Sequence, residues 1–405
     1  MVPNGWSILP LSAITKEKIS YGIVQAGPHV KDGVPYIKSS DVGSEIQIDK
    51  LQRTSTGIHH KYRRSAVHPS DIVFSLRGNI GRTSIVPPEL NEANLTQGTA
   101  RISVSSEHDT KYVYYQLAST PILNKINSLS KGSTFKEISL EELRKVKLTI
   151  PSLPEQSKIA TILSTWDKAI STTERLIDNS KQQKKALMQQ LLTGKKRLLD
   201  DTGRRFSGVW EKHPVGKICK SIVPGRNKPK QFDGDIPWVT TPEIKGRFIP
   251  SKLQLNYISK TTLKECGAKL VPEGAVVMAA VGELGLTSIT TQPLVLNQQL
   301  HAFVCDENIN NVYLSYWLSY QKPYMESVAS KTTIPYMNKT NCESIPVLVP
   351  SIEEQKKIAS VLTNADNEID LLEQQLADLK QEKKALMQQL LTGKRRVKVE
   401  NTEEA

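Results

Sequence analysis

Two segments of the chain carry apolar residues at alternating spacings of four and three positions over about nine helical turns. The first runs from Ile159 to Leu191 and the second from Ile358 to Leu390. This spacing is typical of the contact stripe of a coiled coil. A helix of this length buries such a stripe only against another long helix, so the two segments are predicted to pair with each other. The first stripe is the more polar, because it includes Thr173 and Ser180.

Local signals at both ends of each segment predict where the helices begin and end. A Ser-x-x-Glu pattern begins at Ser152 and again at Ser351, and it predicts a capping box at each start. Gly194 and Gly393 follow the last apolar residues, where a left-handed residue ends a helix. Each segment is therefore predicted to form one helix of about 38 residues, roughly 57 Å long.

These two segments are copies of each other. The word KKALMQQLLTGK occurs at 184–195 and 383–394, and the surrounding segments 151–197 and 350–396 align without a gap. In that alignment 26 of 47 positions are identical. The chain therefore contains a duplicated long helix.

The residues before each helix repeat more loosely. GWSILPLSAI from Gly5 corresponds to VWEKHPVGKI from Val209, and RGNIGRTSI from Arg77 corresponds to VGELGLTSI from Val281. Short apolar runs between glycines and prolines predict strands, mixed with short helices in an α+β arrangement. The predicted order is a globular domain, a long helix, a second globular domain, a second long helix and a flexible tail. The corresponding ranges are 1–150, 151–197, 198–349, 350–396 and 397–405.

Composition narrows the class of protein. The formal net charge of +13 favours a polyanionic partner such as nucleic acid. We find neither an apolar stretch of about 18 residues nor a signal peptide, so we expect no membrane contact and a cytoplasmic location. The four cysteines lie too far apart for a zinc site, and no metal is expected. The sequence contains no phosphate-binding, dinucleotide-binding or amino-methyltransferase motif, so the chain is not expected to be an enzyme.

Candidate nucleic-acid contacts in the first domain are cationic, aromatic or close to glycine. The sequence HHKYRR mixes cations with an aromatic ring, as phosphate-binding surfaces do, although a solvated charged loop has the same composition. Two arginines flank the turn sequence GNIG, and a lysine follows a predicted strand. The candidates are Lys38, Lys61, Tyr62, Arg63, Arg64, Arg77 and Arg82.

The second domain offers cations in GRNKPK and KGRF, together with a threonine at the place of the first domain's strand-end residues. An arginine that binds guanine through two hydrogen bonds adds discrimination, whereas a phosphate contact adds affinity without sequence preference. The sequence does not separate these roles. The candidates are Arg226, Lys228, Lys230, Thr241, Lys245 and Arg247.

Two interpretations remain open for the lysines inside the helical stripes, Lys184 and Lys383. They fix the helix register from a buried position, or they extend outward to contact DNA or a partner. Packing alone would tolerate apolar exchanges, so the identity of the repeated word favours a partner surface presented twice. The predicted subunit-binding residues are Lys184, Lys185, Gln189, Lys383, Lys384 and Gln388.

The order of these motifs, given twice, resembles the specificity subunit of type I restriction-modification systems. The resemblance rests on W..LPL..I, G(V/I)P(Y/W)(I/V), G..G.TS, PS..EQ.KIA and KKALMQQLLTGK, and it extends to about Arg396. It implies two target-recognition domains, each reading one half of a split DNA sequence. It also implies that the helices form an antiparallel coiled coil.

The resemblance further implies partners that perform the chemistry. Two methyltransferase subunits would dock on the helices, and two restriction subunits would complete the endonuclease. S-adenosylmethionine, ATP and Mg²⁺ are then expected on those subunits and no cofactor on this chain. Two other classes remain as alternatives: a coiled-coil scaffold whose domains bind protein, and an enzyme that acts alone on nucleic acid.

Overall fold

The computed structural model describes residues 3–22, 25–43, 45–132, 136–225, 227–251, 253–330 and 332–399. It divides into two compact units, each of which combines one globular domain with part of both long helices. Unit 1 contains residues 1–174 and 374–405, and unit 2 contains residues 175–373. The beginning of one long helix and the end of the other therefore belong to the same unit.

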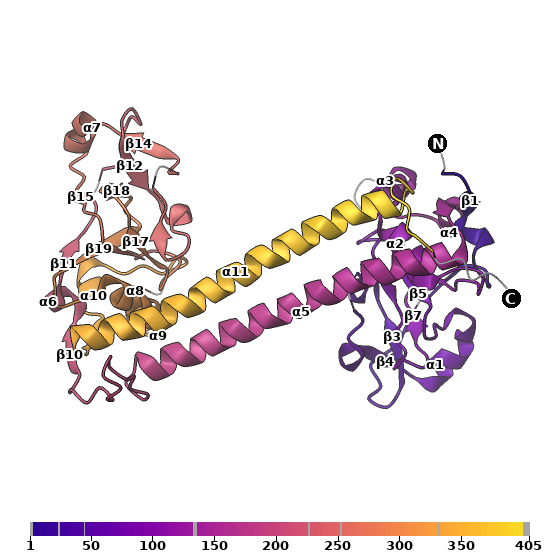
Figure 1. The fold of residues 1–405 in the computed structure, drawn as a ribbon, viewed down its shortest axis with the longest axis horizontal. Helices are drawn as coiled ribbons and strands as arrows, with labels where there is room; N and C mark the ends of the chain where they lie inside the picture. Colours follow the sequence, from indigo (N-terminus) through magenta and orange to yellow (C-terminus); the bar gives the residue numbers. More distant parts are fainter. Residues whose placement is uncertain are drawn as a thin grey trace. The chain divides into compact units, whose positions relative to one another are not determined.

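The globular part of unit 1 consists of small sheets covered by short helices (Figure 1). A four-stranded sheet has the order β2-β8-β5-β6, a three-stranded sheet has the order β4-β3-β7, and β1 pairs with β9. The strands are β1 Ser7–Pro10, β2 Ser20–Tyr21, β3 Val34–Ile37, β4 Gln52–Thr54, β5 Ile72–Ser75, β6 Thr83–Ile85, β7 Asn94–Leu95, β8 Thr99–Ile102 and β9 Lys147–Ile150. The short α-helices are α1 Thr56–Lys61, α2 Thr110–Ala118, α3 Thr120–Leu129 and α4 Leu140–Lys145. Four 3-10 turns are η1 Leu11–Ala13, η2 Ser39–Asp41, η3 Ile48–Lys50 and η4 Arg63–Ser65.

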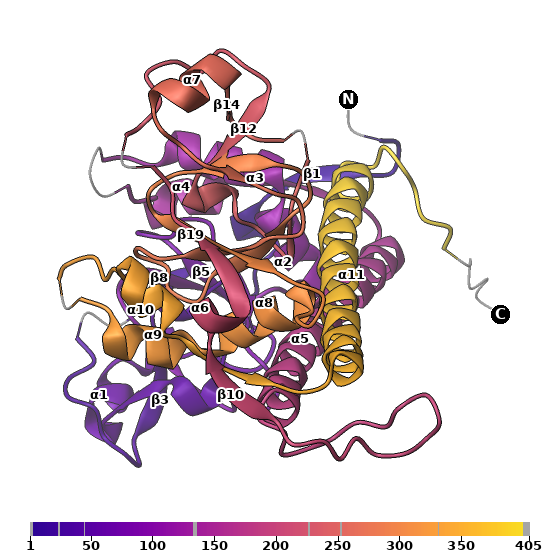
Figure 2. The same cartoon turned by 90° about the vertical axis from the view of Figure 1, so that its left-hand side faces the viewer.

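Unit 2 has sheets of order β11-β19-β16-β17-β13 and β14-β12-β18-β15, and β10 pairs with β20. Figure 2 labels β10, β12, β14 and β19 of this unit. The first strands are β10 Glu211–Pro214, β11 Cys219–Ile222, β12 Ile236–Val239, β13 Phe248–Ile249, β14 Asn256–Ile258 and β15 Leu270–Val271. The remaining strands are β16 Val276–Ala279, β17 Thr287–Thr290, β18 Leu294–Leu296, β19 Leu300–Cys305 and β20 Pro346–Val349. The short helices are α6 Val215–Ile218, η5 Thr241–Glu243, α7 Lys260–Glu265, α8 Asn311–Tyr320, α9 Lys322–Val328 and α10 Lys339–Glu343.

The two globular parts share one topology. In both, a fully buried strand, β5 or β16, lies between two antiparallel neighbours, β8 and β6 or β19 and β17. In both, the strand that carries the repeated Pro-aromatic pair is parallel to a later strand, β3 to β7 and β12 to β18. The predicted α+β class and the repeated plan are thereby confirmed.

The long helices are α5 Leu153–Leu191 and α11 Ile352–Leu390, of 39 residues each. Ion pairs join the two helices within each unit. As the residue number of the partner on α5 increases, the residue number of the partner on α11 decreases. The ion pairs are Asp167 with Lys383 and Glu174 with Lys380 in unit 1, and Lys181 with Glu373 and Lys184 with Asp366 in unit 2. The predicted antiparallel pairing is therefore confirmed. The predicted stripe positions are all buried or half-buried.

The helix ends follow the predicted chemistry in part. Gly194 and Gly393 both have φ of 69°, and each amide donates to the carbonyl three residues earlier. At the start of α11 the Ser351 hydroxyl accepts from the Glu354 amide at 3.3 Å, as in a capping box. The carboxylates of Glu155 and Glu354 do not complete that box, because they accept hydrogen bonds from tryptophan and arginine side chains instead.

Candidate nucleic-acid interface

Three loops of the first domain bring polar side chains together beside the ends of β3, β5 and β7. The Arg77 guanidinium donates to the Gln97 side-chain oxygen at 3.2 Å, and the Ser39 hydroxyl donates to the Arg77 carbonyl at 3.0 Å. Lys38 lies next to Ser39 and donates to Gln52 at 3.4 Å. We call Lys38, Ser39, Arg77 and Gln97 corner 1. A hollow of about 490 Å³ adjoins it and is lined by Ser39 and Arg77, together with Glu137. Arg77 and Gln97 are exposed, so corner 1 offers a cationic and an amide group to a ligand.

The second domain has a polar cluster at the same topological place. The Thr241 hydroxyl donates to the Gln299 side-chain oxygen at 3.2 Å, and the Asn297 amide donates to that oxygen at 3.3 Å. Gln298 and Gln299 are exposed. We call Thr241, Asn297, Gln298 and Gln299 corner 2. Both corners contain hydroxyl and amide groups, and corner 1 also contains a lysine and an arginine.

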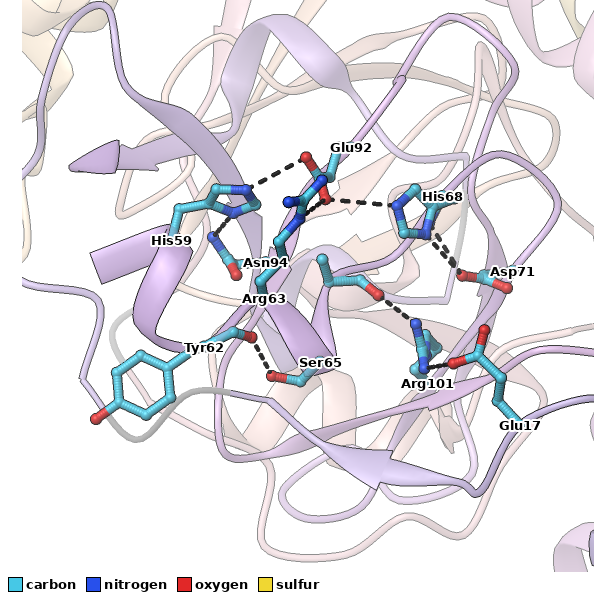
Figure 3. A network of polar contacts seen from close by, with 11 residues as sticks. Glu17, His59, Tyr62, Arg63, Ser65, His68, Asp71, Glu92, Asn94 and Arg101 are labelled. Atoms are coloured by element: carbon cyan, nitrogen blue, oxygen red, sulfur yellow. Dashed lines mark hydrogen bonds and ion pairs between the residues drawn. The ribbon is translucent and has the colours of Figure 1, made fainter. Parts of the chain in front are cut away.

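An internal polar network holds the HHKYRR segment in place (Figure 3). His59 is buried, and its ring nitrogens face Asn94 at 2.9 Å and Glu92 at 3.3 Å. The Glu92 carboxylate also lies 3.4 Å from the Nε2 atom of His68 and 3.9 Å from the Nε atom of Arg63. The His59 side of the HHKYRR segment therefore packs against the domain interior. The cations Lys61, Arg63 and Arg64 are exposed, and Tyr62 is half-buried beneath the Lys61 ammonium.

The other predicted contacts divide into exposed and internal side chains. Arg82, Lys228, Lys230 and Lys245 are exposed. Arg226 lies outside the described residues. Arg247 is internal, with a side chain that is 16% exposed.

Arg247 belongs to a cluster that joins the second domain to α11. Its guanidinium lies 3.4 Å from the Tyr316 ring centre and donates to Asp366 at 3.0 Å and to Ser315 at 2.9 Å. Lys184 also pairs with Asp366, and the Tyr316 hydroxyl donates to it at 2.5 Å. Two Arg247 nitrogens are thus engaged within unit 2, where they serve the structure.

Burial, hydrogen bonds and charge within this cluster determine the pKa values of Asp366 and Tyr316. Burial raises the pKa of the Asp366 carboxyl, but hydrogen bonds from Lys184, Tyr316 and Arg247 outweigh burial and hold that pKa below its usual value. Burial, partly opposed by the charge of Arg247 and supported by the hydrogen bond to Asp366, raises the pKa of Tyr316 to about 12. The carboxylate is therefore ionised and the phenol neutral at neutral pH.

Unit 1 contains the same arrangement without the arginine. Lys383 donates to Asp167 at 2.5 Å and lies 5.3 Å from the Tyr115 ring centre, and the Tyr115 hydroxyl donates to Asp167 at 2.6 Å. Burial raises the pKa of Tyr115. Both stripe lysines are thus half-buried and ion-paired between the helices, which is the position expected of residues that fix the helix register.

The similar starts of α5 and α11 are fixed by a second pair of matched clusters. We call Trp6, Glu155 and Arg396 junction 1, and Trp210, Glu354 and Arg197 junction 2. In each, the glutamate accepts from the indole nitrogen, at 3.1 Å in junction 1 and 3.0 Å in junction 2. It also accepts two bonds from the arginine, at 2.6 and 2.8 Å in junction 1 and 2.6 and 2.7 Å in junction 2. The arginines end the repeated segment, so two of its identical positions, the glutamate and the arginine, serve these junctions.

Part of the repeated word remains on the surface. Lys185 and Gln189 on α5, and Lys384 and Gln388 on α11, are exposed. The same two side chains are therefore presented once in each unit.

The residues that sequence reasoning missed are the amides of the two corners. Gln97 and Gln298 occupy the same place in the repeats LTQG and LNQQ, so the internal alignment contained the signal. Among the described residues, no group of three potential metal ligands is found. None of the described helices is long and apolar enough to cross a membrane.

Comparison with known proteins gives this architecture a family. The model of the type I restriction modification DNA specificity domain matches residues 15–180 and 209–381. The chain is 26% identical over 418 residues to the protein assigned as the MjaX specificity subunit of Methanocaldococcus jannaschii, with 98% of this chain and 95% of that protein aligned. It is 26% identical over 391 residues to the MjaIX specificity subunit of the same organism, covering 90% and 87% of the two proteins.

A solved structure agrees at the level of the fold. The type I restriction-modification S subunit from M. genitalium superposes with a TM-score of 0.60 at 15% identity, over 96% of this chain and 98% of that one. Both tandem domains are matched by the family model, and the resemblance predicted from the motifs is confirmed. This chain belongs to the family of type I restriction-modification DNA specificity subunits.

Proposed function

We propose that this specificity subunit reads a split DNA target, with corner 1 contacting one half-site and corner 2 the other. The supporting observation is that both domains bring polar side chains to the same topological place and differ there in chemistry. Arginine and lysine pair preferentially with guanine, whereas asparagine and glutamine pair with adenine. Corner 1 is therefore suited to a guanine-containing half-site and corner 2 to an adenine-containing one.

The exposed cations around the corners would add affinity without sequence preference. Lys61 and Arg64 in the first domain, and Lys228, Lys230 and Lys245 in the second, carry free surface charge suited to phosphates. Their contribution should fall as salt increases, because each neutralised phosphate releases counterions.

The exposed part of the repeated helix word is the proposed docking surface for two methyltransferase subunits. Lys185 and Gln189 present in unit 2 what Lys384 and Gln388 present in unit 1. Restriction subunits would join that complex. S-adenosylmethionine, ATP and Mg²⁺ are proposed to be bound by those partners, and this chain to contribute recognition rather than catalysis in the cytoplasm.

The recognition proposal is tested by mapping adenine methylation in cells that express the chain with its methyltransferase subunit. The expected result is one new motif of two short half-sites around a fixed gap. An assembled complex that produces no new motif would contradict the proposal and favour the scaffold interpretation. Methylation by the purified chain alone would favour an enzyme acting by itself.

The docking proposal is tested by charge reversal on the exposed helix face. Lys185→Glu combined with Lys384→Glu should reduce the number of methyltransferase copies bound, measured by native mass spectrometry. Arg175→Glu, also exposed on α5, is the matched control and should bind normally. Equal binding by both variants would contradict the docking surface.

A further inference from the structure

Unit 1 contains a pocket of about 430 Å³ beside the end of α2, the start of α3 and the last turns of α11. Figure 1 shows α3 and the end of α11 side by side. Its wall includes the apolar side chains of Pro121, Ile122 and Met387, and its lining also includes Gln116 and Ser119. The pocket therefore lies where the repeated helix word meets the first domain.

Comparison of the two repeated domains explains why unit 1 contains this pocket. Helix α2 corresponds to α8. The hydroxyls of Tyr112 in α2 and Tyr313 in α8 each donate to a strand carbonyl. The hydroxyls of Tyr115 and Tyr316 each donate to an aspartate of a long helix. In that alignment Gln116 and Ser119 correspond to Trp317 and Tyr320. The Trp317 and Tyr320 rings lie 6.2 Å apart and pack in the cluster that contains Leu191 and Leu192. Unit 2 thus places two aromatic rings where unit 1 has two smaller polar side chains.

Two polar groups of the pocket, the Gln116 amide and the Ser119 hydroxyl, are already engaged. The Gln116 amide donates to the Leu391 carbonyl and the Thr149 hydroxyl, both at 2.9 Å. The Ser119 hydroxyl donates to the Gln116 carbonyl at 2.7 Å. An occupant therefore gains little from hydrogen bonding to these groups, and the pocket favours an apolar or aromatic side chain.

The charged side chains that line the pocket are all lysines: Lys147, Lys380, Lys383 and Lys384. Lys380 and Lys383 pair with Glu174 and Asp167, whereas Lys147 and Lys384 are exposed. This charge favours an occupant with carboxylates on either side of the inserted side chain. Lys384 and Gln388 on the rim belong to the proposed docking surface, which indicates the source of the occupant.

We propose that this pocket receives an aromatic side chain, flanked by carboxylates, from the methyltransferase subunit that docks on unit 1. The inference rests on the proposed docking of that subunit. Large aromatic side chains that fill a pocket near the centre of an interface commonly dominate its binding energy. Docking on unit 1 then depends on insertion into the pocket, whereas docking on unit 2 meets a surface that Trp317 and Tyr320 already fill.

The test is to fill the pocket with the residue of unit 2. In native mass spectrometry with the methyltransferase subunit, Ser119→Tyr should bind one copy at least tenfold more weakly than the unaltered chain does. Tyr320→Ser, the reverse change in unit 2, is the matched control and should not produce that loss. Full binding of two copies by a folded Ser119→Tyr chain would overturn the pocket proposal. Failure of the unaltered chain to bind any methyltransferase would overturn the docking proposal itself.

A second variant protects the test against misfolding. Lys384→Glu changes an exposed rim residue and should weaken the same copy, whereas Lys185→Glu should weaken the other. A photoreactive benzophenone side chain at Ile122 should crosslink to an aromatic and acidic segment of the methyltransferase. A crosslink to DNA, or none to the methyltransferase in the assembled complex, would contradict the assigned occupant.

Discussion

The two junctions and the two corners diverge to very different extents, although both are pairs of repeated sites. Junctions 1 and 2 use the same three residue types, with bond lengths that agree within 0.1 Å. Corners 1 and 2 share their place in the fold and one glutamine, Gln97 or Gln298, but their other side chains differ. The duplicated plan is thus retained where helix and domain must meet and altered on the surface that we propose reads DNA.

The reason for this difference lies in burial. The Glu155 and Glu354 side chains are 3% and 1% exposed, so each requires charged partners of matching geometry. The exposed side chains of the corners can be exchanged with little effect on folding. The junctions therefore tolerate few alternatives, and the corners tolerate many.

The largest expected effect follows from breaking junction 2. Glu354→Ala leaves the Arg197 guanidinium and the Trp210 indole without their acceptor. It should lower the free energy of unfolding of unit 2 by about 3–5 kcal/mol. Hydrogen exchange of α8 amides measures that loss within unit 2, and Glu353→Ala, an exposed neighbour, is the control.

The same change in unit 1 sharpens the comparison. Glu155→Ala should have a smaller effect on α2 exchange, because Arg396 is 47% exposed and Arg197 only 20%. An equal or larger effect in unit 1 would show that burial of the arginine does not set the strength of the junction.

A smaller effect is expected from removing the arginine found only in unit 2. Arg247→Ala deletes two hydrogen bonds and a cation-π contact and should destabilise unit 2 by about 2–3 kcal/mol. Lys245→Ala, at an exposed position in the same loop, should leave α8 exchange unchanged. If Arg247→Ala weakened DNA binding without changing exchange, the structural role would be wrong.

The corners should respond in specificity rather than in stability. Arg77→Ala should reduce discrimination at one position of one half-site by about 1–3 kcal/mol, measured as competition between oligonucleotides. Gln298→Ala should relax the other half-site and leave the first unchanged. Uniform loss of affinity for all sequences would assign Arg77 to phosphate contact instead.

Sequence periodicity was sufficient to predict the long helices and their pairing, and capping signals predicted where the helices begin and end. Each depends on local signals such as the apolar stripe, Ser351 and Gly393, and these act over a few turns. The role of Arg247 was not predictable, because its partner Asp366 lies 119 positions away and the contact depends on the tertiary fold. The network around His59 was missed for the same reason, since HHKYRR reads as a surface segment unless Glu92 and Asn94 are known to lie beneath it.

The identical repeated word shows a second limit. Identity alone favoured a partner surface, and the structure shows that its lysines at Lys184 and Lys383 pair between the helices. One stretch of sequence serves internal contacts on one side and an exposed face on the other. Only the fold separates the two sets of residues.

The smallest expected effect concerns pH and distinguishes the two stripe clusters. The pKa of Asp366 is lowered in the folded chain, so its contribution to stability is present above the ordinary aspartate pKa near 4 and is lost as pH falls through the folded value. The pKa of Tyr316 is raised to about 12, so its contribution is present below about pH 10 and is lost as pH rises toward 12. Asp366→Asn should therefore flatten the acid side of the unit 2 stability profile, and Tyr316→Phe the alkaline side. Urea midpoints measured from pH 3 to pH 11 test both, and unchanged slopes in the two variants would mean that this cluster does not govern the pH dependence of unit 2.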